Sequence, residues 1–437
     1  MQANPVTLKT ALAAAACGAL TLLAGAARAG EWRYDSENGQ ITHDDTGVIL
    51  VVSVTSGTDL TIKGFKQSNR AAIHMGGSRR MLPPGVSPEV SELPLGDAVA
   101  GGYRITGIDD KAFASSALIS VTIPESVTRI GAEAFSGCYA LTNATIPASV
   151  VNIGAGAFSS CRALKDISVD GANTAYRDIG GVLFSKDGTL LAVYPAGKKG
   201  SYDIPAGVAV VGDSAFEDCI GLTEVTIPDS VTAIGTEAFF WCRSLTGVTI
   251  PSGVASIGDS TFYGCINLTD VTIPDSVTAI GRRAFKDCKS LAGVTLPPGV
   301  TNIGAEAFSG CASLPSVTIP GGVADAGDYA FAGCSNLASV TICDGVTEIG
   351  RWMFKDCVRL AGVTLPDSVI DINYEAFSGC RKLTGITIPS SVAYIGKRAF
   401  AGCGDMVRVT VPASVTELSD SAFPDPTRVI RTKAKTD

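Results

Sequence analysis

Cysteine is the residue of this chain whose number and spacing could do chemistry. Of 13 cysteines, 11 recur at one position of a repeat, and Cys343 takes a place where other repeats have proline. The 11 are Cys138, Cys161, Cys219, Cys242, Cys265, Cys288, Cys311, Cys334, Cys357, Cys380 and Cys403. In an exported chain this number invites a disulfide framework. Because each repeat has one such cysteine among apolar residues, the pattern favours free, buried thiols.

Histidine, the usual catalytic base, is almost missing. His43 and His74 are 31 positions apart, which is not a metal-ligand spacing, and no histidine follows residue 74. No Gly-Lys-Ser/Thr loop for phosphate is present. The sequence therefore predicts no catalytic, metal-binding or cofactor-binding residue, no cofactor and no enzyme. An enzyme would have to use residues 30–92, outside the repeats.

The elements that position the cysteines recur along the sequence with a period of 23. The anchors are Phe216, Phe239, Phe262, Phe285, Phe308, Phe331, Phe354, Phe377, Phe400 and Phe423, preceded by Phe113, Phe135 and Phe158. Around each anchor the frame reads roughly L-x-x-V-T-I-P-x-x-V-x-x-I-G-x-x-A-F-x-x-C. A fixed period of this length indicates a solenoid.

One repeat shows what each position does. Val225 and Ile227 would share the inner face of a short strand, and Pro228 would end it. Ala238, Phe239 and a cysteine three positions later have the spacing of one helical or 3₁₀ turn. A single coil cannot enclose a core, so each must be covered by the next.

The motif I-G-x-x-A-F-x-x-C followed by L-x-x-V-T-I-P resembles the BspA-type leucine-rich repeat, from about residue 105 to the end. The resemblance implies an α/β repeat fold. The implied fold is a right-handed leucine-rich-repeat solenoid of 23-residue coils, with short strands on the concave face and short helical or 3₁₀ turns. It also implies a secreted or surface protein with a role in binding or adhesion.

The chain divides into four parts. Residues 1–29 are predicted to be a cleaved signal peptide, with a transmembrane anchor as the alternative. Residues 30–92 are predicted to form a β-rich N-terminal cap, residues 93–424 the solenoid, and residues 425–437 a C-terminal end cap and polar tail. The mature chain would have no transmembrane segment and would be secreted, periplasmic or on the cell surface. Cleavage would move the formal net charge from −8 to −10, which disfavours nucleic acid as a partner.

The repeat period is interrupted once, because the interval between Phe158 and Phe216 is two periods and about half of another. The enlarged repeat at about 166–203 contains two strand-like runs around residues 185–188, which indicates a hairpin. The hairpin could be a protruding binding element. The alternative is a surface insertion that the fold tolerates, because lengthening a loop costs little.

The surface offers two kinds of candidate binding site. A column of threonines lies on the outer face of the strands, either because threonine favours strands or as a platform for a glycan or an extended protein. Six aromatic residues occupy variable positions near the anchors of neighbouring coils. They are Tyr329, Trp352 and Tyr374 in one cluster and Phe240, Trp241 and Tyr263 in another. They are typical of interface anchors, although they could simply cover apolar surface.

The sequence thus predicts a secreted or cell-surface binding protein. Its partner would be a protein or glycan, for adhesion to a host or matrix protein or recognition of a surface polymer. The alternative is a structural, self-associating component of an envelope or extracellular matrix. The pattern specifies neither the ligand nor an oligomeric state.

Overall fold

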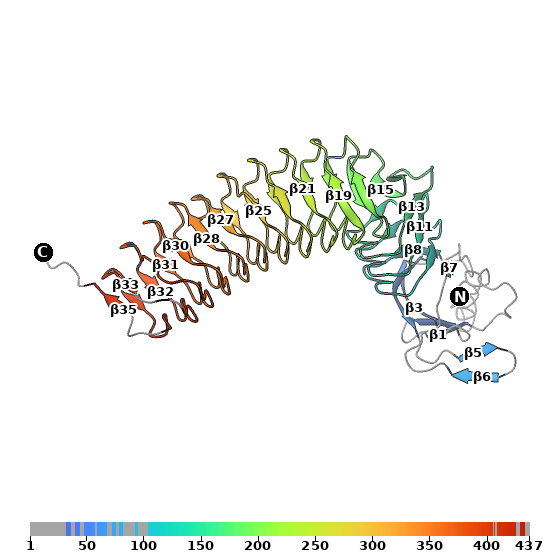
Figure 1. Ribbon diagram of the computed structural model, residues 1–437. Helices are drawn as coiled ribbons and strands as arrows, with labels where there is room; N and C mark the ends of the chain where they lie inside the picture. Colours follow the sequence, from blue (N-terminus) through green and yellow to red (C-terminus); the bar gives the residue numbers. More distant parts are fainter. Residues whose placement is uncertain are drawn as a thin grey trace. The chain divides into compact units, whose positions relative to one another are not determined.

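The computed structural model describes the strands between residues 32 and 94, then residues 104–404, 406, 409–424 and 429–432, with side chains from residue 106 onward. The predicted signal peptide lies outside the described residues. The chain forms two compact units, residues 1–198 with 215–219, and residues 199–214 with 220–437. Each is a stack of short strands that follow one another along the chain (Figure 1).

Most coils supply one strand to each of two parallel ladders. In the first unit, the V-T-I ladder contains β7 (Glu92–Pro94), β9 (Ser120–Thr122), β11 (Asn143–Ile146) and β13 (Asp166–Val169). The second ladder there contains β8 (Arg104–Ile108), β10 (Arg129–Ile130) and β12 (Asn152–Ile153). Neighbouring strands pair in parallel at the repeat spacing, so that equivalent residues stack in columns.

The second unit continues the same plan. Its V-T-I strands are β17 (Gly200–Asp203), β19 (Leu222–Thr226), β21 (Gly247–Thr249), β23 (Asp270–Thr272), β25 (Gly293–Val294), β27 (Ser316–Ile319), β28 (Ser339–Ile342), β30 (Gly362–Thr364), β33 (Val409–Val411) and β35 (Val429–Arg431). Its other strands are β18 (Val210–Val211), β20 (Ala233–Ile234), β22 (Ser256–Ile257), β24 (Ala279–Ile280), β26 (Asn302–Ile303), β29 (Glu348–Ile349), β31 (Asp371–Ile372), β32 (Tyr394–Ile395) and β34 (Glu417–Leu418). The predicted solenoid of 23-residue coils is therefore correct.

The first 100 residues contribute strands that do not follow the repeat. β1 (Trp32–Asp35), β2 (Gln40–His43), β3 (Val48–Ser56) and β4 (Asp59–Gln67) pair antiparallel in order, and β4 pairs in parallel with β8. β5 (Ala72–Met75) and β6 (Ser78–Met81) pair antiparallel with each other. That residues 30–92 cap the array stays a prediction.

The enlarged repeat contributes to the core. β14 (Tyr176–Ile179), β15 (Val182–Ser185) and β16 (Leu190–Val193) pair antiparallel, and Leu183, Phe184 and Leu191 are fully buried. Tyr194 then stacks on Phe216, with ring centroids 4.8 Å apart, where other coils have two phenylalanines. The hairpin is thus packed by its apolar residues and is more than an insertion on the surface.

The prediction of helical or 3₁₀ turns was wrong, because the described residues contain no helix. In the representative coil, Glu237 and Trp241 each have φ of 58°, a left-handed conformation that ends any helical run. The N–H groups of Glu237, Phe239 and Trp241 donate to carbonyls of the next coil, whereas the intervening N–H groups close turns within the coil. In this turn segment, alternate N–H groups therefore bond to the neighbouring coil. In a helix, these N–H groups would bond to carbonyl groups of the same segment.

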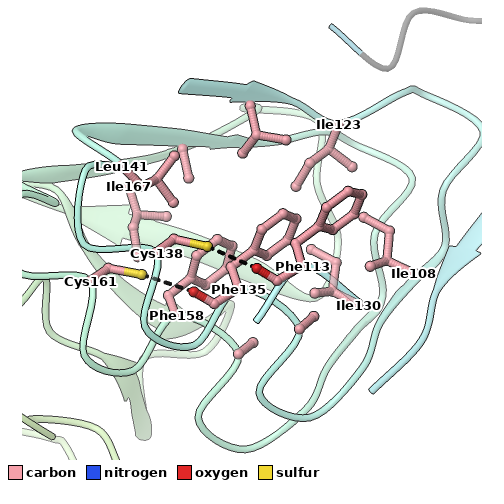
Figure 2. Packing of buried hydrophobic residues seen from close by; sticks show 14 of the residues in the cluster. Ile108, Phe113, Ile123, Ile130, Phe135, Cys138, Leu141, Phe158, Cys161 and Ile167 are labelled. Atoms are coloured by element: carbon pink, nitrogen blue, oxygen red, sulfur yellow. Dashed lines mark hydrogen bonds between the residues drawn. The ribbon is translucent and has the colours of Figure 1, made fainter. Parts of the chain in front are cut away.

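Phenylalanine rings form the centre of the core. In the first unit, Phe113, Phe135 and Phe158 stack with centroids 5.2 and 5.1 Å apart, among the buried Ile108, Ile130 and other apolar side chains (Figure 2). From Phe239 to Phe423 in the second unit, successive rings lie 5.0–5.8 Å apart and nearly parallel. The period of 23 is thus the distance along the chain between stacked rings.

The glycine of the I-G step is required by the approach of the preceding coil. A Cβ on Gly235 would lie 2.6 Å from the backbone nitrogen of Asp213, and one on Gly281 would lie 2.7 Å from that of Asp259. Neither glycine has a positive φ. Close stacking of the coils therefore explains the glycine.

Candidate functional site

The repeated cysteines are free thiols with a structural role. All 12 described cysteines are unbridged, and all but Cys343 are buried. The Sγ–H group of Cys138 donates to the carbonyl oxygen of Phe113 in the preceding coil at 3.1 Å, and that of Cys161 does so to Phe135 at 3.1 Å (Figure 2). The same bond, at 3.1–3.3 Å, is made by Cys265, Cys288, Cys311, Cys334, Cys357, Cys380 and Cys403.

Burial makes several of these thiols poor nucleophiles. It raises the pKa of Cys334 to about 12 and that of Cys403 to about 12, and it holds the pKa of Cys265 and Cys288 well above the ordinary value. A thiol needs a lowered pKa and solvent access to react readily. The described part of the chain also holds no group of three or more His, Cys, Asp or Glu residues able to bind a metal ion.

Tyr329, Trp352 and Tyr374 form one cluster, called here the C-terminal aromatic cluster. The Tyr329 and Trp352 rings stack with centroids 4.5 Å apart and planes 6° apart, and the Trp352 and Tyr374 rings meet edge to face at 5.1 Å. All three side chains are half-buried. Tyr329 and Trp352 have φ of 60° and 54°, at the same left-handed position that Glu237 occupies in its coil. The fold therefore brings together the three residues that the sequence placed on consecutive coils.

An ion-pair network borders the C-terminal aromatic cluster. Glu375, only 4% exposed, pairs with Lys355 at 2.8 Å and with Arg398 at 3.3 Å. Burial opposes ionisation of Glu375, but hydrogen bonds from Lys355 and Tyr374, together with the charge of Arg398, outweigh it and lower its pKa. The surface here combines an aromatic centre with fixed charges of both signs.

Phe240, Trp241 and Tyr263 form the N-terminal aromatic cluster. The Phe240 and Tyr263 rings stack at 5.0 Å, and Trp241 meets both rings edge to face. A Cβ on Gly264 would lie 2.9 Å from the Trp241 ring, and the Arg243 guanidinium lies 4.3 Å from the ring centroid. These contacts support the interpretation that this cluster covers the side of the coils.

Sequence reasoning missed the charged residues between the two clusters. The Glu306 carboxylate binds Arg283 at 2.8 Å, lies 3.7 Å from Arg282 and also pairs with Lys286. The pKa of Glu306 is lowered. Burial alone would raise it, but the hydrogen bonds from Lys286 and Arg283 outweigh the effect of burial. The available signal was the spacing, because residues 283 and 306 are one repeat apart and so lie on adjacent coils.

The outer face of the V-T-I ladder has an open hollow of ≈ 660 Å³ near its C-terminal end. Threonines and glycines line it together with four apolar residues, and the lining residues are Gly362, Val363, Thr364, Gly385, Ile386, Thr387, Ile388, Thr410, Pro412 and Thr432. A Cβ on Gly362 or Gly385 would meet nothing within 4 Å. This is the part of the threonine column that a small polar ligand could enter.

No helix in the described residues has the length and apolar character needed to cross a membrane.

Comparison with known proteins agrees with the repeat pattern. A family model for the BspA type leucine rich repeat region matches residues 104–193, 199–315 and 301–429 in 6 copies. No curated protein matches the chain.

Solved structures of other leucine-rich-repeat proteins are also similar to this chain. A leucine-rich repeat protein from Bacteroides ovatus is 25% identical, with a TM-score of 0.55, over 88% of this chain and 98% of its own. A leucine rich cell surface protein from Faecalibacterium prausnitzii is 26% identical over 90% of this chain and 95% of its own, with a TM-score of 0.43. Since the family model covers well over half of the residues, this chain belongs to the BspA-type leucine-rich-repeat family.

Proposed function

We propose that this protein is an exported, cell-surface binding protein that holds a protein partner through the C-terminal aromatic cluster. Membership of the family, the predicted signal peptide at residues 1–29 and the similar cell-surface protein from F. prausnitzii support a surface location. The comparisons indicate no catalytic family, in keeping with a binding role. Adhesion to a host or matrix protein is the role that fits best.

The observation that carries the proposal is the geometry of Tyr329, Trp352 and Tyr374. Half-buried aromatic rings bordered by ion pairs have the composition of a binding hot spot and its polar rim. Trp352 stacks on Tyr329 and meets Tyr374, so the rings cover one another's faces. Sugar rings pack on free aromatic faces, and this cluster therefore favours a protein over a glycan. The hollow beside Thr387 is the alternative site for a glycan.

Replacing Trp352 tests the proposal. Trp352→Ala should weaken binding to the partner at least about 30-fold, because hot-spot truncations cost about 2 kcal/mol or more. The measurement is capture of the exported chain on immobilised matrix proteins and surface glycans, followed by titration against any that retains it. Circular dichroism and thermal melting would establish that the variant is folded.

Tyr139→Ala is the matched control, because Tyr139 is 56% exposed and lies outside both clusters. Its binding should equal that of the unchanged protein. If the folded Trp352→Ala variant bound as tightly as the control, the C-terminal aromatic cluster would not be the binding site.

The second candidate function is lateral self-association in an envelope or extracellular matrix. A regular pattern of exposed charges on residues 220–404 favours it.

A further inference from the structure

Positive charge between residues 220 and 404 is confined to one side of the coils. Residues 220–404 contain 12 Lys and Arg and 16 Asp and Glu. Every one of the 12 basic residues lies in the segment between the second ladder and the next V-T-I strand, called here the turn side. They are Arg243, Arg282, Arg283, Lys286, Lys289, Arg351, Lys355, Arg359, Arg381, Lys382, Lys397 and Arg398. Within the same range, the ladders and the corner that joins them carry only acidic charges.

The corner between the two ladders carries an exposed aspartate in four coils. These residues follow the proline of the P-x-x-V step, or Cys343 in one coil, and are Asp229, Asp275, Asp344 and Asp367. The other coils have Ser252, Pro298, Gly321 and Ser390 at this position. We call this column the acidic corner.

The turn side of the same four coils carries an exposed basic residue next to the repeated cysteine. These residues are Arg243, Lys289, Arg359 and Arg381, called here the basic column. Three lie directly after the cysteine, and Arg359 lies one position further along. The coils without a corner aspartate have Ile266, Ala312, Ser335 and Gly404 after the cysteine. Acid and base therefore occur in the same coils and are missing from the same coils.

The two columns do not neutralise each other within the molecule. Among the described residues, none of these eight side chains forms an ion pair with another charged group. The path of the chain explains this, because the corner joins the two ladders while the turn side closes the coil beyond them. Arg243 packs over Trp241, and Arg359 bonds to Asn336.

We propose that a second copy of this chain docks side by side with the first. The acidic corner of one copy meets the basic column of the next, with both arrays pointing the same way and no shift along the array. Strands stack at a fixed spacing of about 4.8 Å, so the charges of both copies have the same spacing in register. Each aspartate then faces the basic residue of the equivalent coil.

This contact uses two different surfaces of the molecule, and each docked copy keeps one of them free. Such heterologous contacts extend into open rows unless a rotation closes them. A linear polyanion could use the basic column but would leave the acidic corner without a role. The match between the columns, coil by coil, therefore favours a second copy. The proposal gives the self-association function its contact surfaces and does not depend on the C-terminal aromatic cluster.

Sedimentation velocity of the exported chain tests association over a concentration series. At about 20 mM salt the chain should form dimers and longer species as its concentration rises, and at about 500 mM salt it should be monomeric, because salt screens exposed charges. A chain that stayed monomeric at low salt and high concentration would overturn the proposal. Salt-resistant association would also do so.

Two complementary variants test the geometry. One replaces the four corner aspartates by asparagine, and the other replaces the four basic-column residues by glutamine. All eight side chains are exposed, so both variants should fold, as circular dichroism would verify. Each alone should be monomeric, and an equimolar mixture should form dimers and nothing longer, because each copy keeps one working surface. A mixture without dimers would rule out the contact.

A charge swap within one chain gives a sharper control. Asp367→Arg alone or Arg381→Asp alone should weaken association about 5-fold or more, whereas the double variant should recover most of it, since opposite charges face each other again. Retention on heparin-agarose tests the alternative partner, a linear polyanion. If only Arg381→Asp altered retention and neither single variant altered self-association, a polyanion would replace a second copy.

Discussion

At the scale of single residues, the next coil decides which side chain is tolerated. The repeated phenylalanine must present a flat ring to its neighbours, and the cysteine must be small, apolar and able to reach a carbonyl oxygen 3.1–3.3 Å away. At the start of the column Ser116 stands in place of cysteine, and its hydroxyl lies 3.1 Å from the Cys138 sulfur. The common property of the column is a small side chain with a hydrogen to donate.

A first prediction concerns the state of the thiols. The mature protein, denatured without reductant, should titrate near 12 thiols with a thiol reagent, because every described cysteine is unbridged. The native protein should react far more slowly, since all of these thiols except Cys343 are buried. A titre near zero after denaturation would show that the column forms disulfides.

The thiols also predict how stability depends on alkaline pH. The folded pKa of Cys334 and of Cys403 is about 12, whereas an unfolded thiol titrates near 8.5. Their contribution is complete below about pH 8.5 and is lost as pH rises toward the folded value, at up to about 1.4 kcal/mol per pH unit for each thiol. Thermal melting from pH 8 to 11 should therefore show a falling melting temperature. A Cys334→Ala, Cys403→Ala variant should show a shallower fall.

A third prediction compares two glycines. Gly281→Ala should destabilise the protein by about 2 kcal/mol or more, because the new Cβ would lie 2.7 Å from backbone atoms of the preceding coil. Gly385→Ala should change stability by less than about 0.5 kcal/mol, since nothing lies within 4 Å of its added Cβ. Urea denaturation of both variants checks this, and equal losses would contradict the packing argument.

At the scale of elements, strands and turn segments differ in what they determine. Pairing of the strands places equivalent residues of successive coils directly beside one another. Like charges at one repeat position can therefore face each other in neighbouring strands. In the second ladder Glu348 pairs with Asp371, and Glu417 lies two strands beyond Asp371. The pKa of Asp371 is raised by burial first, and then by the charges of Glu348 and Glu417.

This column of acids predicts a stabilising substitution. Asp371→Asn should raise stability at pH 7 by about 0.5 kcal/mol, a small effect because water screens these partly exposed charges. A raised carboxyl pKa favours the folded state at low pH and disfavours it once the group ionises, so the gain should vanish near pH 3. Chemical denaturation at both pH values measures the difference, with the exposed Asp420→Asn as a neutral control. A gain that persisted at pH 3 would exclude charge repulsion as its cause.

At the scale of the whole molecule, stability comes from contacts between neighbouring coils. Each coil hydrogen-bonds and packs on the next, so the array behaves as a sum of units and interfaces. Removing one complete coil should therefore leave the stacking of all the remaining coils intact. The same reasoning makes the spacing of surface charges a property of the array, as the acidic corner and the basic column illustrate.

Deletion of residues 293–315 tests this additivity. The deletion joins Ala292 to Ser316 and removes one full period, so the protein should remain folded and cooperative, with a somewhat lower melting temperature. Deleting only residues 293–303 should unfold the second unit, because the following phenylalanines would lose their partners. Circular dichroism and thermal melting distinguish the two outcomes. Equal damage from both deletions would contradict a modular array.

The sequence by itself determined the period, the inward columns and the family. A recurrence of Phe, Cys and Gly at one fixed interval has one simple physical explanation, which is coils that share a core. It also placed Tyr329, Trp352 and Tyr374 on consecutive coils, where the structure finds them in contact.

Only the tertiary structure decided the form of the turn segments, the role of glycine and the bonds of the thiols. The spacing of Ala238, Phe239 and Cys242 suggested a short helical or 3₁₀ turn, but alternate N–H groups there bond to the next coil. Local propensity cannot reveal a hydrogen-bond partner that lies almost a full repeat away along the chain. For the same reason, the preceding coil that excludes a Cβ from Gly281 is visible only once the coils are stacked.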